Sequence, residues 1–205
     1  MGGRGASSGV GPKKSKTGIF GLNLEGNTSL ESAIKRTNPN YKQNYGYQEN
    51  CQKCVYVFEM NMRGYNVQAA PTYSDDDIVM RNWDKVMKGQ KTEKVGGKTV
   101  NAVKSNLMNK IVGFGKDSRS VIYVEWKDGG AHVFNAVRRN NKTKFIDSQI
   151  GKEIDINKIL SRIKPSKTQI SRIDNLSPTS LIIKCVRNSG TDRKKRGKRN
   201  GKKRK

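Results

Sequence analysis

Three strand-like segments follow one another between residues 120 and 147, and the turns between them constrain the fold more than any other feature. Residues 120–126 (SVIYVEW) and 131–138 (AHVFNAVR) are rich in β-branched and aromatic residues, and a shorter segment follows at 144–147. The connections KDGG and NNK are typical of tight β-hairpins. Because strands joined in this way are antiparallel neighbours, the sequence predicts an antiparallel sheet in the second half of the chain.

Helical patterns precede this sheet. In residues 51–62 the apolar positions recur at spacings of three and four, and Gly64 suits the position just after a last helical turn. The other predicted elements are a short helix that starts after the cap Ser29 and stops at Asn38-Pro39, an extended segment at 65–71, helices at 73–89 (capped by Ser74) and 100–115, a short helix at 155–163 and a last strand at 180–186.

The order of these elements, helices first and an antiparallel sheet afterwards, predicts the α+β class. A length of 205 residues predicts one domain with extensions. We expect residues 1–27, rich in Gly, Ser and Lys, to be a flexible arm, residues 28–187 to form the domain, and residues 188–205 to be a disordered basic tail. The low apolar fraction of 33% agrees with segments outside any core.

The chain is strongly basic, with a formal net charge of +25, and this charge is unevenly distributed. The end of the tail carries ten of the charges, and removing them leaves +15 on the preceding residues. Such a surface attracts polyanions, namely nucleic acid, anionic lipid or acidic protein faces. The predicted nucleic-acid-binding residues are Arg193, Lys194, Lys195, Arg196, Lys198, Arg199, Lys202, Lys203, Arg204 and Lys205.

No apolar run approaches the ~18 residues that a membrane-spanning helix needs, and no signal-peptide pattern is recognised. Gly2 fits a myristoylation signal, but Ala6 stands where that signal has Ser or Thr. Three cysteines are an odd number and too few for a secreted disulfide scaffold. We therefore expect the protein to act in a reducing compartment such as the cytoplasm.

A cysteine, the chain's single histidine and an aspartate stand in a suggestive order. Cys51 opens a predicted helix, His132 begins a later strand, and Asp147 ends the next strand. This is the layout of papain-like cysteine enzymes. The positive end of the helix dipole favours a thiolate at Cys51, and neighbouring antiparallel strands place His132 beside Asp147. The sequence thus predicts Cys51 as nucleophile, His132 as general base and Asp147 as the acid that orients the imidazole.

Two side-chain amides are candidates for supporting this chemistry. An oxyanion needs two donors, and the backbone N–H of Cys51 at the helix start is the first. Asn50 is the nearest candidate for the second. Gln149 lies two residues past Asp147, so it could donate as well or share in orienting the imidazole.

Other interpretations use the same residues. Cys51, Cys54, His132 and Cys185 could together bind zinc, although structural zinc sites usually repeat a close pair of ligands. A redox-active Cys51-x-x-Cys54 pair would normally follow a strand, which is missing here. Buried structural cysteines with an incidental histidine are a third interpretation. We favour the thiol enzyme, and predict no cofactor and no metal.

The sequence resembles a known family in three blocks. NCQKCVYVFEMNMRGYNVQAAP matches a pattern of Asn-Cys-x-x-Cys-Val followed by Arg-Gly-Tyr-x-Val-x-Ala-x-Pro, and GGAHVFNAVRRNNKTKFIDSQIGK contains His-x-Phe-Asn and Phe-Ile-Asp-x-Gln. These blocks, in this order over residues 38–165, resemble the papain-fold toxin domain called glutamine deamidase (Tox-PL). Such domains are found in bacterial polymorphic toxins and in phage-associated proteins.

The resemblance implies a papain-like fold in which the nucleophile's helix packs on an antiparallel sheet. It implies catalysis by Cys51, His132 and Asp147, with Cys54 as a core residue behind the nucleophile. The reaction would be hydrolysis of a protein amide, most simply the side chain of glutamine, through a thioester. A bacterial toxin would be delivered into a target cell, or carried with a phage particle, and would be met by an immunity protein.

The residues leave two alternatives open. The same machinery cleaves peptide or isopeptide bonds, so the chain could be a protease. The chain could also be a nucleic-acid-binding protein whose papain-like core is inactive and whose charge carries the function. Trp83, Trp126, Phe58, Val86 and Tyr123 are expected in the core, and Asp75–Asp77 at a helix start.

Overall fold

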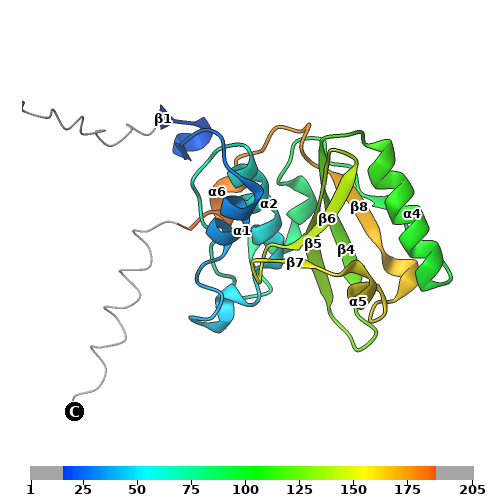
Figure 1. Cartoon of the computed structure of the whole chain (residues 1–205). Coiled ribbons are helices and arrows are strands. Elements are labelled where there is room, and N and C mark those ends of the chain that lie inside the picture. Colours follow the sequence, from blue (N-terminus) through cyan, green and yellow to red (C-terminus); the bar gives the residue numbers. More distant parts are fainter. Residues whose placement is uncertain (1–15, 188–205) are drawn as a thin grey trace, which may run out of the picture.

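The computed structural model describes residues 16–187, in which a six-stranded sheet has helices on both sides (Figure 1). The strand order is β3-β8-β4-β5-β6-β7, and all neighbours are antiparallel. This arrangement confirms the predicted α+β class. The strands are β3 (Glu93–Lys94), β4 (Ser118–Glu125), β5 (Ala131–Arg139), β6 (Lys142–Asp147), β7 (Lys152–Ile154) and β8 (Gln169–Arg172).

The helices divide between the two sides of the sheet. In Figure 1, α1 (Leu30–Thr37), α2 (Cys51–Met62) and α6 (Ile182–Cys185) lie on one side and α4 (Val100–Gly113) on the other. The shorter helical elements are η1 (Ile19–Gly21), η2 (Tyr45–Tyr47), α3 (Ile78–Arg81), η3 (Trp83–Lys85), α5 (Ile156–Leu160) and η4 (Pro165–Lys167).

The three-stranded block β4-β5-β6 has the predicted hairpins. β4 and β5 pair from Ser118 with Arg138 to Glu125 with Ala131. Asn140 and Asn141, between β5 and β6, have φ angles of 49° and 63°, as a type I′ turn requires. The predicted segments were right, with ends that differ by up to two residues.

Side chains alternate between two cores across these strands. Val121 and Val133 pack with the buried residues of α2, whereas Ile122 and Phe134 pack with those of α4. Helix α2 is surrounded by the first core, and its middle is buried on all sides. This burial fixes the position of its first residue, Cys51, against the sheet.

Helix α2 begins and ends where the sequence predicts. Asn50 is its N-cap, and the carbonyl of Asn50 accepts from the amides of Lys53 and Cys54 at 3.0 Å. Gly64 has a φ angle of +91°, a conformation that ends helices at little steric cost only for glycine. Helix α1 likewise starts after Ser29, whose hydroxyl accepts from the amide of Ser32.

Two predicted elements were wrong. Residues 73–89 contain only the short α3 and η3, because Asp77, and not Ser74, caps α3 and at the same time binds Lys53. Residues 180–186 contain the helix α6 instead of a strand. Ile182 and Cys185, three residues apart, are its buried positions, which is a helical spacing.

Part of the predicted flexible arm belongs to the fold. Residues 16–27 contain the hairpin β1 (Lys16–Thr17) and β2 (Asn23–Leu24), and Glu25 and Gly26 donate their amides to the carbonyl of Gly64. The remainder of the arm, 1–15, and the basic tail, 188–205, lie outside the described residues. Across residues 16–187, no helix is both long and apolar enough to cross a membrane.

Candidate active site

Cys51 is the first residue of α2, as expected, and is 8% exposed. Its Sγ lies 3.2 Å from Oε1 of Gln52. The first amides of a helix have no partner within the helix, so they point outward beside the thiol. A sulfur anion at this position is stabilised by these amides and by the helix dipole.

His132 and Asp147 form a close pair on neighbouring strands. Nε2 of His132 lies 2.9 Å from Oδ2 of Asp147, and their side chains are 11% and 9% exposed. The other carboxylate oxygen, Oδ1, accepts from the backbone amides of Gln149 and Ile150 at 3.1 and 3.3 Å. Asp147 is thus held from behind, and in turn it fixes the orientation of the imidazole ring.

The protonation of His132 reflects this environment. Burial disfavours the imidazolium, but hydrogen bonds to Asp147 and Cys51, together with their negative charges, raise the pKa of His132 to about 10. The imidazolium at His132 is therefore stabilised by both neighbours. The three residues selected from the sequence come together in one group.

Trp126 is a residue of this site that was assigned to the core. Its ring stacks on that of His132 with centroids 5.9 Å apart and planes at 20°, and the guanidinium of Arg162 lies over its ring, 5.3 Å from the centroid. Phe134 stacks near His132 as well, at 6.4 Å. The signal was available, because the hairpin register pairs Val124 with His132 and so brings the end of β4 beside the histidine.

The two predicted amide donors have other partners. Asn50 is fully buried, and its Nδ2 donates to the carbonyl of Ala70 at 3.0 Å and lies 3.5 Å from Oδ1 of Asn38. Nε2 of Gln149 donates to the carbonyl of Gln48 at 2.8 Å. Both amides hold the loop before α2 in place, which corrects the expectation that Asn50 donates to an oxyanion. Gln149 supports Asp147 through its backbone amide instead of its side chain.

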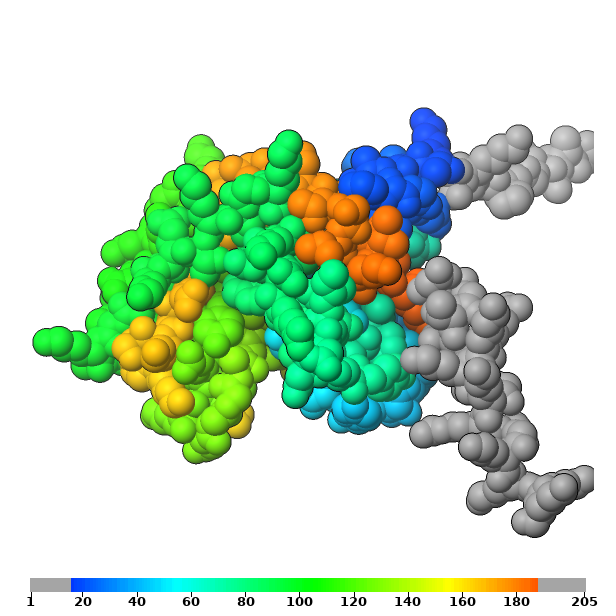
Figure 2. Space-filling model, turned by 180° about the vertical axis from the view of Figure 1, so that it is seen from behind, coloured from blue at the N-terminus to red at the C-terminus, as the bar shows by residue number. Residues whose placement is uncertain are grey.

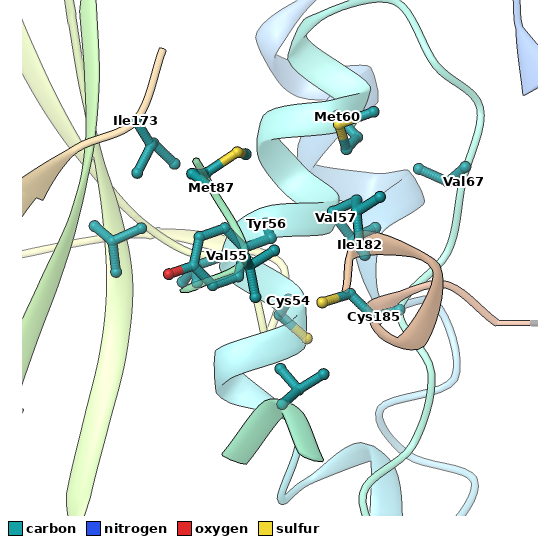
Figure 3. Packing of buried hydrophobic residues seen from close by; sticks show 14 of the residues in the cluster. Cys54, Val55, Tyr56, Val57, Met60, Val67, Met87, Ile173, Ile182 and Cys185 are labelled. Atoms are coloured by element: carbon teal, nitrogen blue, oxygen red, sulfur yellow. The ribbon is translucent and has the colours of Figure 1, made fainter. Parts of the chain in front are cut away.

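Cys54 and Cys185 are buried in the core (Figure 3). Burial raises the pKa of both thiols, which disfavours thiolate chemistry at either of them. The thiol of Cys54 donates to Oδ1 of Asn50 at 3.2 Å. Within residues 16–187, no three His, Cys, Asp or Glu side chains converge on a metal-binding position.

The molecular surface is hollowed beside this region. Seen from behind, a notch separates the lime-green surface near residues 120–130 from the teal-green surface near residues 75–90 (Figure 2). Cyan surface, from the segment around residue 50, lies between them. The segment around residue 50 therefore borders a depression of the surface.

Comparison with known proteins shows to which family the chain belongs. No curated protein and no solved structure is similar enough to match the chain. A family model described as "Papain fold toxin 1, glutamine deamidase" matches residues 49–152, about half of the chain. The matched range includes the start of α2 and the two strands, β5 and β6, that carry His132 and Asp147. The chain belongs to the papain-fold toxin family of glutamine deamidases.

Proposed function

We propose that this protein converts a glutamine side chain of another protein to glutamate, with Cys51, His132 and Asp147 as the catalytic residues. The observation that carries the proposal is the placement of His132, whose Nε2 lies 2.9 Å from Oδ2 of Asp147 and whose pKa is raised by interaction with both Asp147 and Cys51. Membership of a glutamine deamidase family supports the choice of substrate bond.

The reaction follows from this arrangement in two stages. The Cys51 thiolate attacks the carboxamide carbon of glutamine, and the electron pair of the C=O bond moves onto oxygen. His132 gives its proton to the nitrogen, ammonia leaves, and a thioester remains. His132 then takes a proton from water, which attacks the thioester. The C–S bond breaks, and the carboxylic acid of the product, the thiolate and the imidazolium result; the acid then releases its proton to water and becomes glutamate.

The anionic oxygen of these intermediates needs donors, and Gln52 replaces Asn50 as the candidate for one of them. The backbone N–H of Cys51 is the other. The terminal amide of Gln52 lies beside the sulfur, and its oxygen and nitrogen exchange places when the group rotates by a half turn. Rotated in this way, the amide presents an N–H to the region where the oxyanion forms.

Mass spectrometry of candidate proteins after incubation with the enzyme tests the proposal. Deamidation adds about 1 Da at a single glutamine, whereas a protease yields cleaved peptides through the same thioester. Cys51→Ala should abolish the change. Cleavage without deamidation would select the protease, and intact, unmodified proteins under conditions where Cys51 is reactive would contradict both activities.

A toxin family implies particular partners. We infer that the substrate is a protein of a target cell. The enzyme would be delivered into that cell or carried with a phage particle. The producing cell would then hold an immunity protein that covers Cys51. Protection of Cys51 from iodoacetamide by a co-encoded protein would support this inference, and unaltered labelling would contradict it.

The sequence of the tail favours a second function, nucleic-acid binding. Residues 193–205 hold ten basic side chains and no acidic one. Each phosphate that such a tail neutralises contributes about −0.9 to the log–log salt dependence of binding to duplex DNA. Removal of residues 193–205 should flatten this dependence and leave thiol reactivity unchanged. An unaltered salt dependence would contradict a role for the tail.

A further inference from the structure

Asn135 is a polar residue between two valines on one face of β5. It is fully buried, and its neighbours on the same face, Val133 and Val137, are buried as well. Strand residues two apart share a face, so the pattern predicts a third aliphatic side chain at this position. A buried amide is tolerated only with hydrogen-bond partners, and such departures from a local pattern are typical of functional sites.

The partners of Asn135 come from two other elements. Its Nδ2 donates to the carbonyl of Val55 in α2 at 3.2 Å, and its Oδ1 accepts from Oγ of Ser148 at 2.8 Å. Ser148 is also fully buried. One side chain thus joins β5, α2 and the segment that follows β6.

Each of these elements carries or directly adjoins a catalytic residue. Val55 lies one helical turn after Cys51, Ser148 directly follows Asp147, and Asn135 stands three residues after His132 on the same strand. Each hydrogen bond of Asn135 therefore ends close to one member of the triad. We propose that Asn135 is a positioning residue that sets the distance between Cys51 and the His132–Asp147 pair, an inference that rests on the proposed function.

Apolar packing alone does not set this distance. The contacts between α2 and the sheet are largely aliphatic. Hydrophobic burial has no preferred direction, so a small shift of the helix along the sheet changes the free energy of this packing little. A hydrogen bond to a helix carbonyl is directional. The Val55 carbonyl has a second lone pair for this bond besides the one used within the helix.

The chain offers a matched control in Asn61. This residue is also fully buried, and it lies on the same helix α2. Its side chain exchanges hydrogen bonds with the backbone of Val67 at 3.0 and 3.1 Å, and donates to Thr37 at 3.3 Å. It therefore joins α2 to helical and loop segments and not to the strands that carry His132 and Asp147.

The experiment measures alkylation of Cys51 by iodoacetamide as a function of pH, in the full-length protein, with the modified cysteine identified by peptide mass spectrometry. The test variants are Asn135→Ala, Ser148→Ala and the double variant Asn135→Leu with Ser148→Ala. The double variant replaces both side-chain partners with apolar groups and so leaves little buried polarity unpaired. The control is Asn61→Ala, and circular dichroism confirms that each protein is folded.

We expect both Asn135 variants to react at least about tenfold more slowly than the wild type at neutral pH, because small displacements of reacting groups cost large factors in rate. Their rate profile should also shift to higher pH, since separation from His132 weakens stabilisation of the thiolate. Ser148→Ala, in which the bond to Val55 persists, should slow the reaction about threefold. Asn61→Ala should lower the unfolding temperature and leave the rate profile of the folded protein unchanged.

Two outcomes would contradict these expectations, and they differ in which proposal they overturn. The role of Asn135 would be overturned if Cys51 in the folded double variant reacted as fast as in the wild type and with the same pH profile. If the other variants do not fold, the same result in Ser148→Ala would overturn it. The proposed function would stand in both cases. A wild-type Cys51 that is unreactive near neutral pH, and indifferent to His132→Ala, would overturn the proposed function and this inference with it.

Discussion

The two ends of helix α2 are built from different interactions. Around its first turn, neutral amides surround Asn50, with Asn38 and Gln149 both bonded to it, and a single ion pair joins Lys53 to Asp77. Near its last turn, charges hold it: the fully buried Glu59 accepts from Arg63 and, through both oxygens, from Arg119.

The difference follows from what each end does. At the C-terminal end every charge has a partner, so the ion cluster is inert and anchors the helix to the start of β4. At the N-terminal end the amides add no net charge and the Lys53 ammonium is compensated by Asp77, while His132 interacts with both Cys51 and Asp147. Substitutions at the two ends should therefore affect different properties.

The largest effect is expected at the reactive end. His132→Ala should lower turnover by about 10³-fold or more, because nucleophile and base act as a unit. Asp147→Asn should lower it less, since the backbone amides of Gln149 and Ile150 still hold the side chain. Both are checked by the rate of deamidation or of Cys51 alkylation. Unchanged turnover in His132→Ala would show that the reactive end works without its histidine, and would end the papain-like interpretation.

At the anchoring end we expect a loss of stability without a loss of reactivity. Glu59→Gln leaves two arginines with reduced compensation beside a buried position, which should lower the free energy of unfolding by about 3 kcal/mol. Urea denaturation measures this change. Glu31→Gln, which breaks the exposed pair with Lys35 on α1, is the control and should have no measurable effect. If Cys51 in folded Glu59→Gln reacted much more slowly, the two ends would not be independent.

Local signals in the sequence were sufficient for much of the fold. The hairpins were predictable because Asn140 and Asn141 suit a type I′ turn, and α2 because Gly64 ends it. The placement of His132 beside Asp147 followed from the antiparallel pairing of β5 and β6.

The elements that were missed depend on contacts distant in sequence. Residues 180–186 form a helix because Ile182 and Cys185 pack against α2, which their strand-like composition does not reveal. Strand β8 has a weak pattern of its own, and its pairing with β4 stabilises it. Within the site, the partners of Asn50, Trp126 and Asn135 come from other segments, so their roles could not be seen from spacing alone.

A smaller effect is expected from the titration of His132. Its pKa is about 10 in the folded protein, above the ~6.5 of an unfolded chain. Between these values the folded state binds the extra proton, so the stabilisation is fully present below pH ~6.5 and is lost as the pH rises through about 10. We expect the difference in unfolding free energy between wild type and His132→Gln to decrease over this range. A difference that is constant with pH would show that His132 is not charged in the folded protein.

The smallest effect is expected for Cys54→Ala. This variant tests whether Cys51 or Cys54 is the reactive thiol. Cys54 is fully buried and donates to Oδ1 of Asn50, while burial raises the pKa of its thiol. Loss of the sulfur removes one weak hydrogen bond and a small apolar volume, so we expect a decrease of about 1 kcal/mol in unfolding free energy. Because Asn50 keeps its bonds to Ala70 and Asn38, the start of α2 should stay in place and most of the activity should remain. Cys51→Ala is the matched variant, with no activity and near-normal stability. If Cys54→Ala were folded but inactive and Cys51→Ala were active, the nucleophile would be Cys54. The neutral amides around Asn50 would then contact the reacting thiol directly, instead of holding the start of α2 in place.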